Sequence, residues 1–321
     1  MNTISRIARY MERSPVFDER DLPLLYVLPG LFVFTTFMLF PVVYLVGISL
    51  TNATPSTLFT GEGAVSVLTF GESTIVGLEN YTDVLSDSAF WNSFGVTWLF
   101  VATSVVAKIC LSVAIALVVT SNRVRGKRLL RSLIILPMGL PAIFTITVWR
   151  GIFSSAEFGL MNQLLTMLSL DPVTWLSGRW TAFFAYNITE VWLSYPFMVI
   201  ITVSALQDVP SELHEAAMVD GAGYIARFLH VTLPAIKRPV LFASILTAAA
   251  SFQQFLIPYV FNKGGPARAN ELIVVYGYRE ALAFSEYGRG AAISLVAVIF
   301  IGAFMWVNVK RGRLAEGVAE Q

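Results

Sequence analysis

Cysteine and histidine are scarce in this chain, and charged residues are few. The 321 residues include one cysteine, Cys110, and two histidines, His214 and His230. One cysteine cannot form an intrachain disulfide or a thiolate metal site, and the histidines lack the helical spacing of a metal-binding pair. Only 13% of the residues are charged, whereas 56% are hydrophobic. This balance excludes an ordinary soluble domain and indicates a membrane protein.

Several catalytic motifs are also missing. The chain has no Gly-x-x-x-x-Gly-Lys-Ser/Thr loop, no Gly-x-Ser-x-Gly nucleophile turn and no His-Glu-x-x-His pair. It therefore cannot hydrolyse ATP by the P-loop route, and no catalytic constellation supports a membrane enzyme. We expect a non-catalytic protein that binds no metal or cofactor itself.

What the chain does have is a series of long apolar runs. Each is long enough to cross about 30 Å of hydrocarbon as a helix, and none alternates as barrel strands do. We therefore expect an all-α polytopic membrane protein with six transmembrane helices. The expected spans are 24–50, 93–120, 132–153, 181–205, 239–262 and 287–309.

Basic residues are distributed unevenly between the two sides of these spans. Fifteen lie in the two tails, in the loop after the second span and in the loop 206–238, against six on the other side. The loop 51–92 has no Lys or Arg. The positive-inside rule then places both termini and the loop 206–238 in the cytoplasm. We expect cytoplasmic tails at 1–23 and 311–321 around one membrane domain, 24–310.

The loop 206–238 is predicted to fold as a short helical hairpin. Ser211 is expected to cap a first helix, and Gly221 to end it in a left-handed conformation. A second helix is predicted from Tyr224 to His230, and Leu233-Pro234 is expected to turn the chain into the next span.

Small residues leave little side-chain bulk on one face of this hairpin, so that a groove on another protein can approach it closely. The alternative is a hairpin that packs only on its own membrane domain. The apolar residues expected to anchor it in a partner are Leu213, Met218, Ile225, Phe228 and Leu229.

The hairpin resembles the cytoplasmic loop of importer permeases of the ATP-binding-cassette (ABC) superfamily. The matching residues are Glu215-Ala216-Ala217, Gly221 after three residues, and then Val231-Thr232-Leu233-Pro234. In that family the loop is the coupling helix, which sits in a cleft on the ATPase subunit. The resemblance implies an ATPase-coupling set of Glu215, Ala216, Ala217, Asp220, Gly221, Ala222, Phe228, Leu233 and Pro234.

Other segments are similar to carbohydrate importers of the maltose and glycerol-phosphate permease type, such as Trp149-Arg-Gly-Ile-Phe and Gly264-Gly265-Pro266. The resemblance runs from about residue 24 to 310 and implies a type I ABC importer permease fold in the cell membrane. The implied partners are a second permease subunit of a different sequence, two ATPase subunits that use ATP and Mg²⁺, an extracytoplasmic solute-binding protein and membrane lipid. Nucleic acid is not among them.

Polar residues within the spans are candidates for function because they are expensive in lipid. Lys108 and Glu190 are expected either to pair with each other or to face water in a cavity. A third alternative is that Lys108 snorkels, extending its ammonium group toward the membrane surface. We favour a structural or cavity-facing role for Lys108. Pro137 and Pro141 predict a bent third span, which either lines a path or is a packing kink.

A sugar path needs amide and hydroxyl hydrogen bonds together with aromatic faces. Each such residue alone is more often a helix–helix contact. The candidates for the substrate path are Asn187, Glu190, Tyr195, Gln253, Gln254 and Tyr259.

A second hypothesis is a stand-alone secondary transporter of a small polar solute, with its site at the broken helix around Pro137 and Pro141. The sequence shows no evident internal repeat and few intramembrane acids for ion coupling. Both features count against this alternative.

Overall fold

The computed structural model describes residues 22–60, 68–121, 123–156 and 158–311. Within these ranges the chain is helical, and its one extended pairing is an isolated bridge between Thr51 and Ile75. The expected tails 1–23 and 311–321 lie outside the described residues except at their inner ends.

Five helical stretches are long and apolar enough to span a membrane, and a sixth is formed if one bent pair counts as a span. The all-helical membrane fold with six spans is thus confirmed. The long helices are α2 (Leu22–Phe34) with η1 (Thr35–Leu39) and α3 (Phe40–Ser49), α7 (Ser88–Thr120), α11 (Arg179–Gln207), α14 (Leu233–Phe252) and α17 (Tyr287–Arg311). The shorter ones are α4 (Pro55–Leu58), α6 (Glu79–Ser86), α10 (Leu160–Met167), α12 (Ser211–Val219), α13 (Tyr224–Arg227), η2 (Phe228–Thr232), α15 (Leu256–Asn262), α16 (Ile273–Tyr278) and η3 (Arg279–Ala283).

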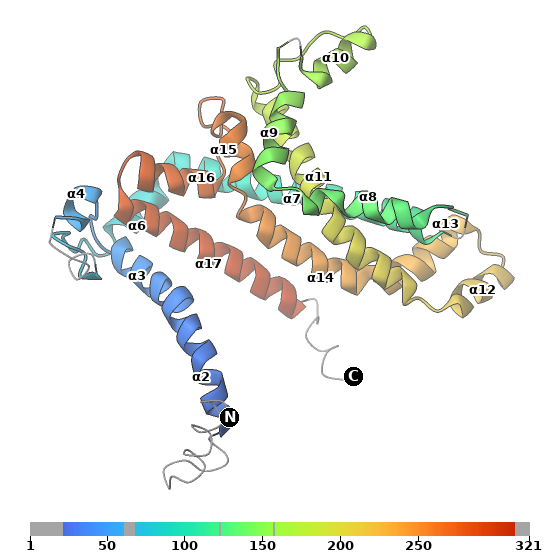
Figure 1. Cartoon of the computed structure of the whole chain (residues 1–321), viewed down its shortest axis with the longest axis horizontal. Helices are drawn as coiled ribbons and strands as arrows, with labels where there is room; N and C mark the ends of the chain where they lie inside the picture. Colours follow the sequence, from blue (N-terminus) through green and yellow to red (C-terminus); the bar gives the residue numbers. More distant parts are fainter. Residues whose placement is uncertain (1–21, 61–67, 122, 157, 312–321) are drawn as a thin grey trace, which may run out of the picture.

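Helices α7, α11 and α14 pack against one another and form the interior (Figure 1). The buried face of α7 carries small hydroxyl residues at helical spacing, including Ser93, Thr97, Ser104 and Ser112. Small residues let helix backbones approach closely, which is how helices associate without a hydrophobic driving force. Lys108 lies on the same face and is the one charge in it.

The third span is broken. Helix α8 (Lys127–Gly139) and helix α9 (Ala142–Ile152) meet at an angle of 98°. Leu140, between them, is extended, as expected for a residue that precedes a proline. The predicted bend of the third span is confirmed, and it lies at Leu140-Pro141, whereas Pro137 lies within α8.

The fifth span ends earlier than predicted. A continuous helical stretch runs from Tyr224 in the hairpin to Phe252, so the expected end at residue 262 is wrong. Helix α15 then starts separately at Leu256. Pro258 explains the break, because a proline lacks the N–H that would bond to residue 254 and its ring clashes with that carbonyl.

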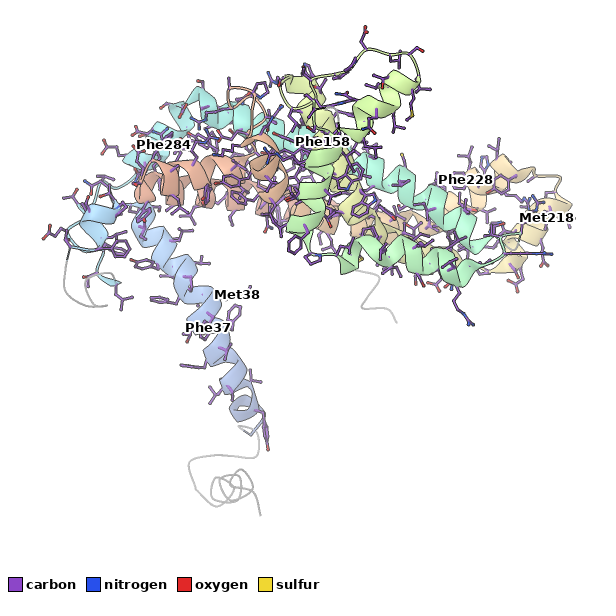
Figure 2. The ribbon with its side chains drawn as sticks, turned by 45° about the horizontal axis from the view of Figure 1, so that its top comes forward. Phe37, Met38, Phe158, Met218, Phe228 and Phe284 are labelled. Atoms are coloured by element: carbon purple, nitrogen blue, oxygen red, sulfur yellow. The ribbon has the colours of Figure 1, made fainter. Side chains whose placement is uncertain are left out.

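The N-terminal arm α2–η1–α3 diverges from the other helices, and it packs against α17 through α3 (Figure 1). Phe37 and Met38 extend from it and are 74% and 65% exposed (Figure 2). A helix that is apolar on every side requires an apolar environment around it, which a bilayer supplies.

Candidate functional site

An ion pair is buried between two of the central helices. The Lys108 ammonium nitrogen on α7 lies 2.6 Å from Glu190 Oε1 on α11, and the two side chains are 0% and 3% exposed. An unpaired charge in this position would be strongly destabilising, so each residue explains the presence of the other. The predicted pairing is confirmed, and Lys108 does not snorkel toward water.

Two hydroxyl groups of α14 complete the surroundings of this pair. Lys108 donates to Ser251 Oγ at 2.8 Å and to Thr247 Oγ1 at 3.3 Å, and Ser251 in turn donates to Glu190 Oε1 at 2.8 Å. Neither hydroxyl residue was predicted from the sequence to be part of the site. Thr247 and Ser251 are four residues apart, which places both hydroxyls on one face of an apolar helix. This spacing is the feature of the sequence that could have indicated their shared role.

Gln254 connects the ion pair to the break in the fifth span. Its amide donates to Glu190 Oε2 at 2.7 Å, while its Oε1 accepts the N–H of Leu256 at 3.1 Å. The first N–H groups of a helix have no partner within that helix. Gln254 therefore caps α15, and the carboxylate of Glu190 fixes the orientation of the capping amide.

The other candidates for the substrate path do not join this network. Asn187 accepts a hydrogen bond from Thr103 Oγ1 at 2.8 Å, which joins α11 to α7, and it donates to the Phe183 carbonyl of its own helix. This is the helix–helix contact that the sequence offered as the alternative to sugar binding. Gln253 is exposed, and within the described residues its side chain makes no hydrogen bond. Tyr195 is half-buried. Substrate contact by any of these residues stays a prediction.

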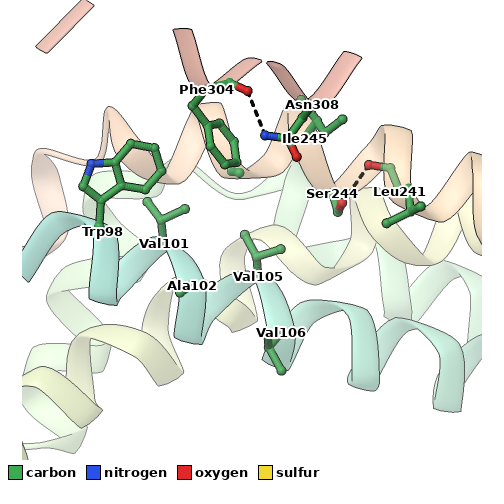
Figure 3. Close-up of a pocket in the computed structure, with 11 residues that line it drawn as sticks. Trp98, Val101, Ala102, Val105, Val106, Leu241, Ser244, Ile245, Phe304 and Asn308 are labelled. Carbon is green, nitrogen blue, oxygen red and sulfur yellow. Dashed lines mark hydrogen bonds between the residues drawn. The ribbon is translucent and has the colours of Figure 1, made fainter. Parts of the chain in front are cut away.

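A groove between α7, α14 and α17 is unsuited to a polar solute (Figure 3). Its walls are apolar, with Trp98, Val105 and Phe304 among them. The hydroxyl of Ser244 and the amide of Asn308 both donate to carbonyls of their own helices, at 2.7 and 2.8 Å. The groove is therefore lined mainly by apolar side chains and offers few polar groups to a solute.

At the opposite end from the hairpin, two arginines share one buried carboxylate. Glu271 is 1% exposed, and its oxygens lie 2.6 Å from Arg268 Nε and 2.8 Å from Arg279 Nε. Burial raises the pKa of nearby Glu280, an effect opposed by Arg289 and Arg268. This cluster was not predicted from the sequence, because its members come from separate short helices and turns.

The end of α12 has the geometry predicted for it. Gly221 has a φ of +82°, in the left-handed region. Its N–H bonds to the Met218 carbonyl at 3.0 Å, and the Ala222 N–H bonds to the Ala217 carbonyl at 2.8 Å. This pair of bonds is a Schellman motif, which satisfies carbonyls that the helix leaves free. Asp220 occupies the C-cap position just before it.

The hairpin extends beyond the packed helices and leaves apolar side chains uncovered. Met218 lies at its tip and is 50% exposed, and Phe228 is nearer the bundle (Figure 2). Ile225 is 72% exposed. Glu215 and Ala216 are exposed on α12, the helix that carries Met218. A surface of this kind is typical of a helix that docks in a groove of another protein.

Two details of the predicted hairpin are wrong. Ser211 is the first helical residue rather than the cap, since Pro210 occupies the cap position and no side chain caps the helix. Leu233-Pro234 does not turn the chain, because the helix continues through it. The π-helical turn η2, which ends at Thr232 just before Leu233-Pro234, accommodates the missing proline N–H.

A family comparison decides the class of protein. Residues 108–309 match the family described as "Binding-protein-dependent transport system inner membrane component". The chain belongs to this family. It is a membrane-embedded permease component, so the resemblance to ABC importer permeases is confirmed and the stand-alone secondary transporter is not supported.

Related permeases agree with the carbohydrate-uptake branch of this family. The trehalose/maltose transport system permease protein MalF of Thermococcus litoralis is 34% identical over 297 residues, which cover 92% of this chain and 95% of that protein. The arabinooligosaccharides permease AraP of Bacillus subtilis is 27% identical and aligns with 93% of this chain. The maltose/maltodextrin permease MalF of Escherichia coli K12 is 30% identical over 259 residues, and the chain spans 50% of its length.

Solved structures share the fold of this family. A chain from a bacterial ABC transporter that imports the acidic polysaccharide alginate superposes with a TM-score of 0.72, covering 96% of this chain and 98% of that chain. The sequence identity is 17%, so the likeness is one of fold. The importer permease fold is thus confirmed.

Proposed function

We propose that this permease forms half of the translocation path of an ATP-driven sugar importer. The observation that carries the proposal is the exposed helical hairpin α12–α13, whose apolar tip projects from the bundle. The named functions of its relatives, uptake of trehalose, maltose and arabinooligosaccharides, support the sugar class.

The charge distribution supports a cytoplasmic position for the hairpin. Arg227, Lys237 and Arg238 accompany it, whereas the loop 51–92 has no basic residue. Basic residues are enriched in cytoplasmic loops. Both termini would then be cytoplasmic, and the Arg268–Glu271 cluster would lie on the outer side.

The proposed partners follow from the family. Two ATPase subunits would each bind ATP and Mg²⁺, and a second permease subunit of different sequence would form the other half of the path. A solute-binding protein would deliver the sugar from outside. This chain would contribute the docking hairpin, with Glu215, Gly221 and their neighbours in the coupling set, and would itself perform no hydrolysis.

The helix connections support a way of transmitting motion. The hairpin connects α11 to α14 along the chain. A displacement of the docked hairpin would therefore pull or push on both helices. Lys108, Glu190 and Ser251 bind α7, α11 and α14 together, which favours movement of the three helices as one body. Binding of sugar and nucleotide would be coupled through two arrangements of this body.

Reconstitution tests the proposal. The chain is co-expressed with the products of its neighbouring genes, and uptake of maltose, trehalose, maltodextrin and arabinooligosaccharide into liposomes is measured with and without ATP. We expect ATP-dependent uptake that also requires the solute-binding protein. Met218→Glu should abolish uptake and ATPase co-purification, while Leu168→Glu, an exposed change on the loop after α10, should leave both intact. Uptake by this chain alone, driven by an ion gradient, would reject the proposal.

A further inference from the structure

A polar pocket lies outside the Lys108 network, at the end of the molecule that carries Glu271. Its volume is about 440 Å³, within the range of sites for small organic ligands. It lies between α15, the turn 263–268, α16 and η3, next to the break in the fifth span. The polar residues around it include Tyr259, Asn262, Lys263, Arg268, Tyr278 and Arg279. We call it the outer pocket.

One wall of the outer pocket is aromatic. The ring centroids of Phe255 and Tyr259 are 4.8 Å apart, and those of Tyr259 and Tyr278 are 5.3 Å apart. Tyr278 remains 37% exposed, so its ring is available for a further contact. Phe284, at the edge of the pocket, is 55% exposed (Figure 2). The two tyrosine rings, Tyr259 and Tyr278, each combine an apolar face with a polar hydroxyl.

Two arginine side chains that line the pocket supply fixed hydrogen-bond donors. Arg268 and Arg279 are held through their Nε atoms by the buried Glu271, and Arg279 Nη2 also donates to the Lys263 carbonyl at 2.7 Å. A guanidinium has five N–H donors, so these contacts orient both groups without using all their donors. Lys263 also lines the pocket, and it is an exposed residue. No acidic side chain is among the described residues that line it.

The pocket is also joined to the proposed path. Tyr259 belongs to α15, whose first N–H groups are capped by Gln254, and Gln254 is bonded to Glu190. The position of the aromatic wall therefore depends on the buried ion pair. A ligand in the outer pocket would lie beside the point at which the fifth span breaks.

We propose that the outer pocket binds a sugar ring of the transported saccharide before it enters the span. The ring stacks on Tyr278 and Tyr259, and its hydroxyls accept hydrogen bonds from Arg279 and Lys263. The inference rests on the proposed sugar function and adds an external sugar subsite to it. The basic lining accommodates neutral sugars and uronates, which share the ring and its hydroxyls.

The test uses the whole transporter in lipid nanodiscs, without the solute-binding protein. The probes are maltose, maltodextrin and arabinooligosaccharide as neutral sugars, and alginate pentasaccharide as a uronate. The measurements are acetylation of Lys263 by mass spectrometry and saccharide affinity by calorimetry. Lys310, at the far end of α17, is the internal control for labelling.

We expect the bound saccharide to slow labelling of Lys263 and leave labelling of Lys310 unchanged. Tyr278→Ala should weaken saccharide binding about five- to tenfold, the scale of one lost aromatic contact, whereas Tyr278→Phe should change it by less than about twofold. If only the pentasaccharide protects Lys263, the ligand is a uronate; if the neutral sugars also do, it is a general saccharide.

The outcomes separate this inference from the proposed function. If the reconstituted system imports a sugar with ATP but that sugar neither protects Lys263 nor binds less tightly to Tyr278→Ala, the outer pocket is rejected and the proposed function stands. If no saccharide is imported or bound, the proposed function fails and this inference fails with it.

Discussion

Lys108 and Glu190, separated by 82 positions in sequence, form a contact of 2.6 Å inside the helix bundle. The contact joins α7 to α11, and the hydroxyl of Ser251 on α14 bonds to both charges. Glu190 reaches further through Gln254 to the start of α15. One carboxylate thus fixes the relative positions of four helices.

Removing one partner of this pair should destabilise the protein far more than removing both. Lys108→Met leaves the Glu190 carboxylate buried without its cation, at a cost of about 3–5 kcal/mol. The double variant Lys108→Met/Glu190→Gln should recover most of that loss, because no uncompensated charge remains. The measurement is the thermal unfolding midpoint in detergent.

The controls for this prediction are a surface lysine and a charge swap. Lys237→Met, at an exposed position on α14, should leave the midpoint unchanged. Lys108→Glu/Glu190→Lys should restore expression that either single reversal abolishes. If Lys108→Met and Glu190→Gln, each made alone, unfold at the wild-type midpoint, the pair has no structural role.

Gln254 should matter for α15 rather than for the bundle as a whole. Gln254→Met removes the cap on Leu256 and one hydrogen bond to Glu190, with an expected loss of about 1–3 kcal/mol. Hydrogen exchange should increase in α15 while α7 and α11 stay protected. Gln253→Met, a matched change at the exposed neighbouring amide, should alter neither. Equal exchange for the two variants would contradict the capping role.

Much of this architecture was predictable from sequence, and the exceptions have local causes. Apolar runs predicted the spans, since lipid requires helices of about 20 residues. The end of the fifth span was not predicted, because the apolar run continues through residues 253–262 and only Pro258 signals the break. Pro234 was expected to stop a helix, but a π-helical turn allows the helix to pass through it.

The candidate site, like the fold, was predictable from the sequence only in part. The pairing of Lys108 with Glu190 was predictable, because an apolar interior forces two isolated opposite charges together. Ser251 and Thr247 were not recognised, because hydroxyl residues are common in apolar helices and usually bond to their own backbone. The Arg268–Glu271–Arg279 cluster depends on the paths of separate turns, which no periodicity in the sequence encodes.

Gly221 should be required for its conformation rather than for space. Its φ of +82° disfavours a side chain, although a Cβ there would meet no heavy atom within 4 Å. Gly221→Ala should destabilise the hairpin by about 1–2 kcal/mol and reduce ATPase co-purification. Gly221→Asn, which tolerates the left-handed region, should retain most of the association. Gly223→Ala is the control at a glycine with a φ of −69°, and a loss of association there as large as that of Gly221→Ala would reject the argument.

Asp87 should stabilise the protein in a pH-dependent way. Burial tends to raise the pKa of its carboxyl, but the Ala89 N–H, the Tyr276 hydroxyl and the Arg289 guanidinium together lower it below the ordinary value. A lowered folded-state pKa means that the stabilisation is present above about pH 3.9 and is lost as the pH falls through the folded-state value.

Asp87→Asn tests this sign. Asp87 caps α7 through the Ala89 N–H at 2.8 Å and contacts Arg289 at 2.6 Å, and both residues of the ion pair are about one-quarter exposed. After allowance for solvent screening, the variant should lose about 1 kcal/mol at neutral pH. The gap between the wild-type and variant unfolding midpoints should narrow as the pH is lowered from about 7 to about 3, because the wild-type carboxylate then becomes protonated. Asp83→Asn, at an exposed acid on α6, should show no such gap. A gap that stayed constant over this range would mean that the charge of Asp87 contributes nothing and that its position is held by packing alone.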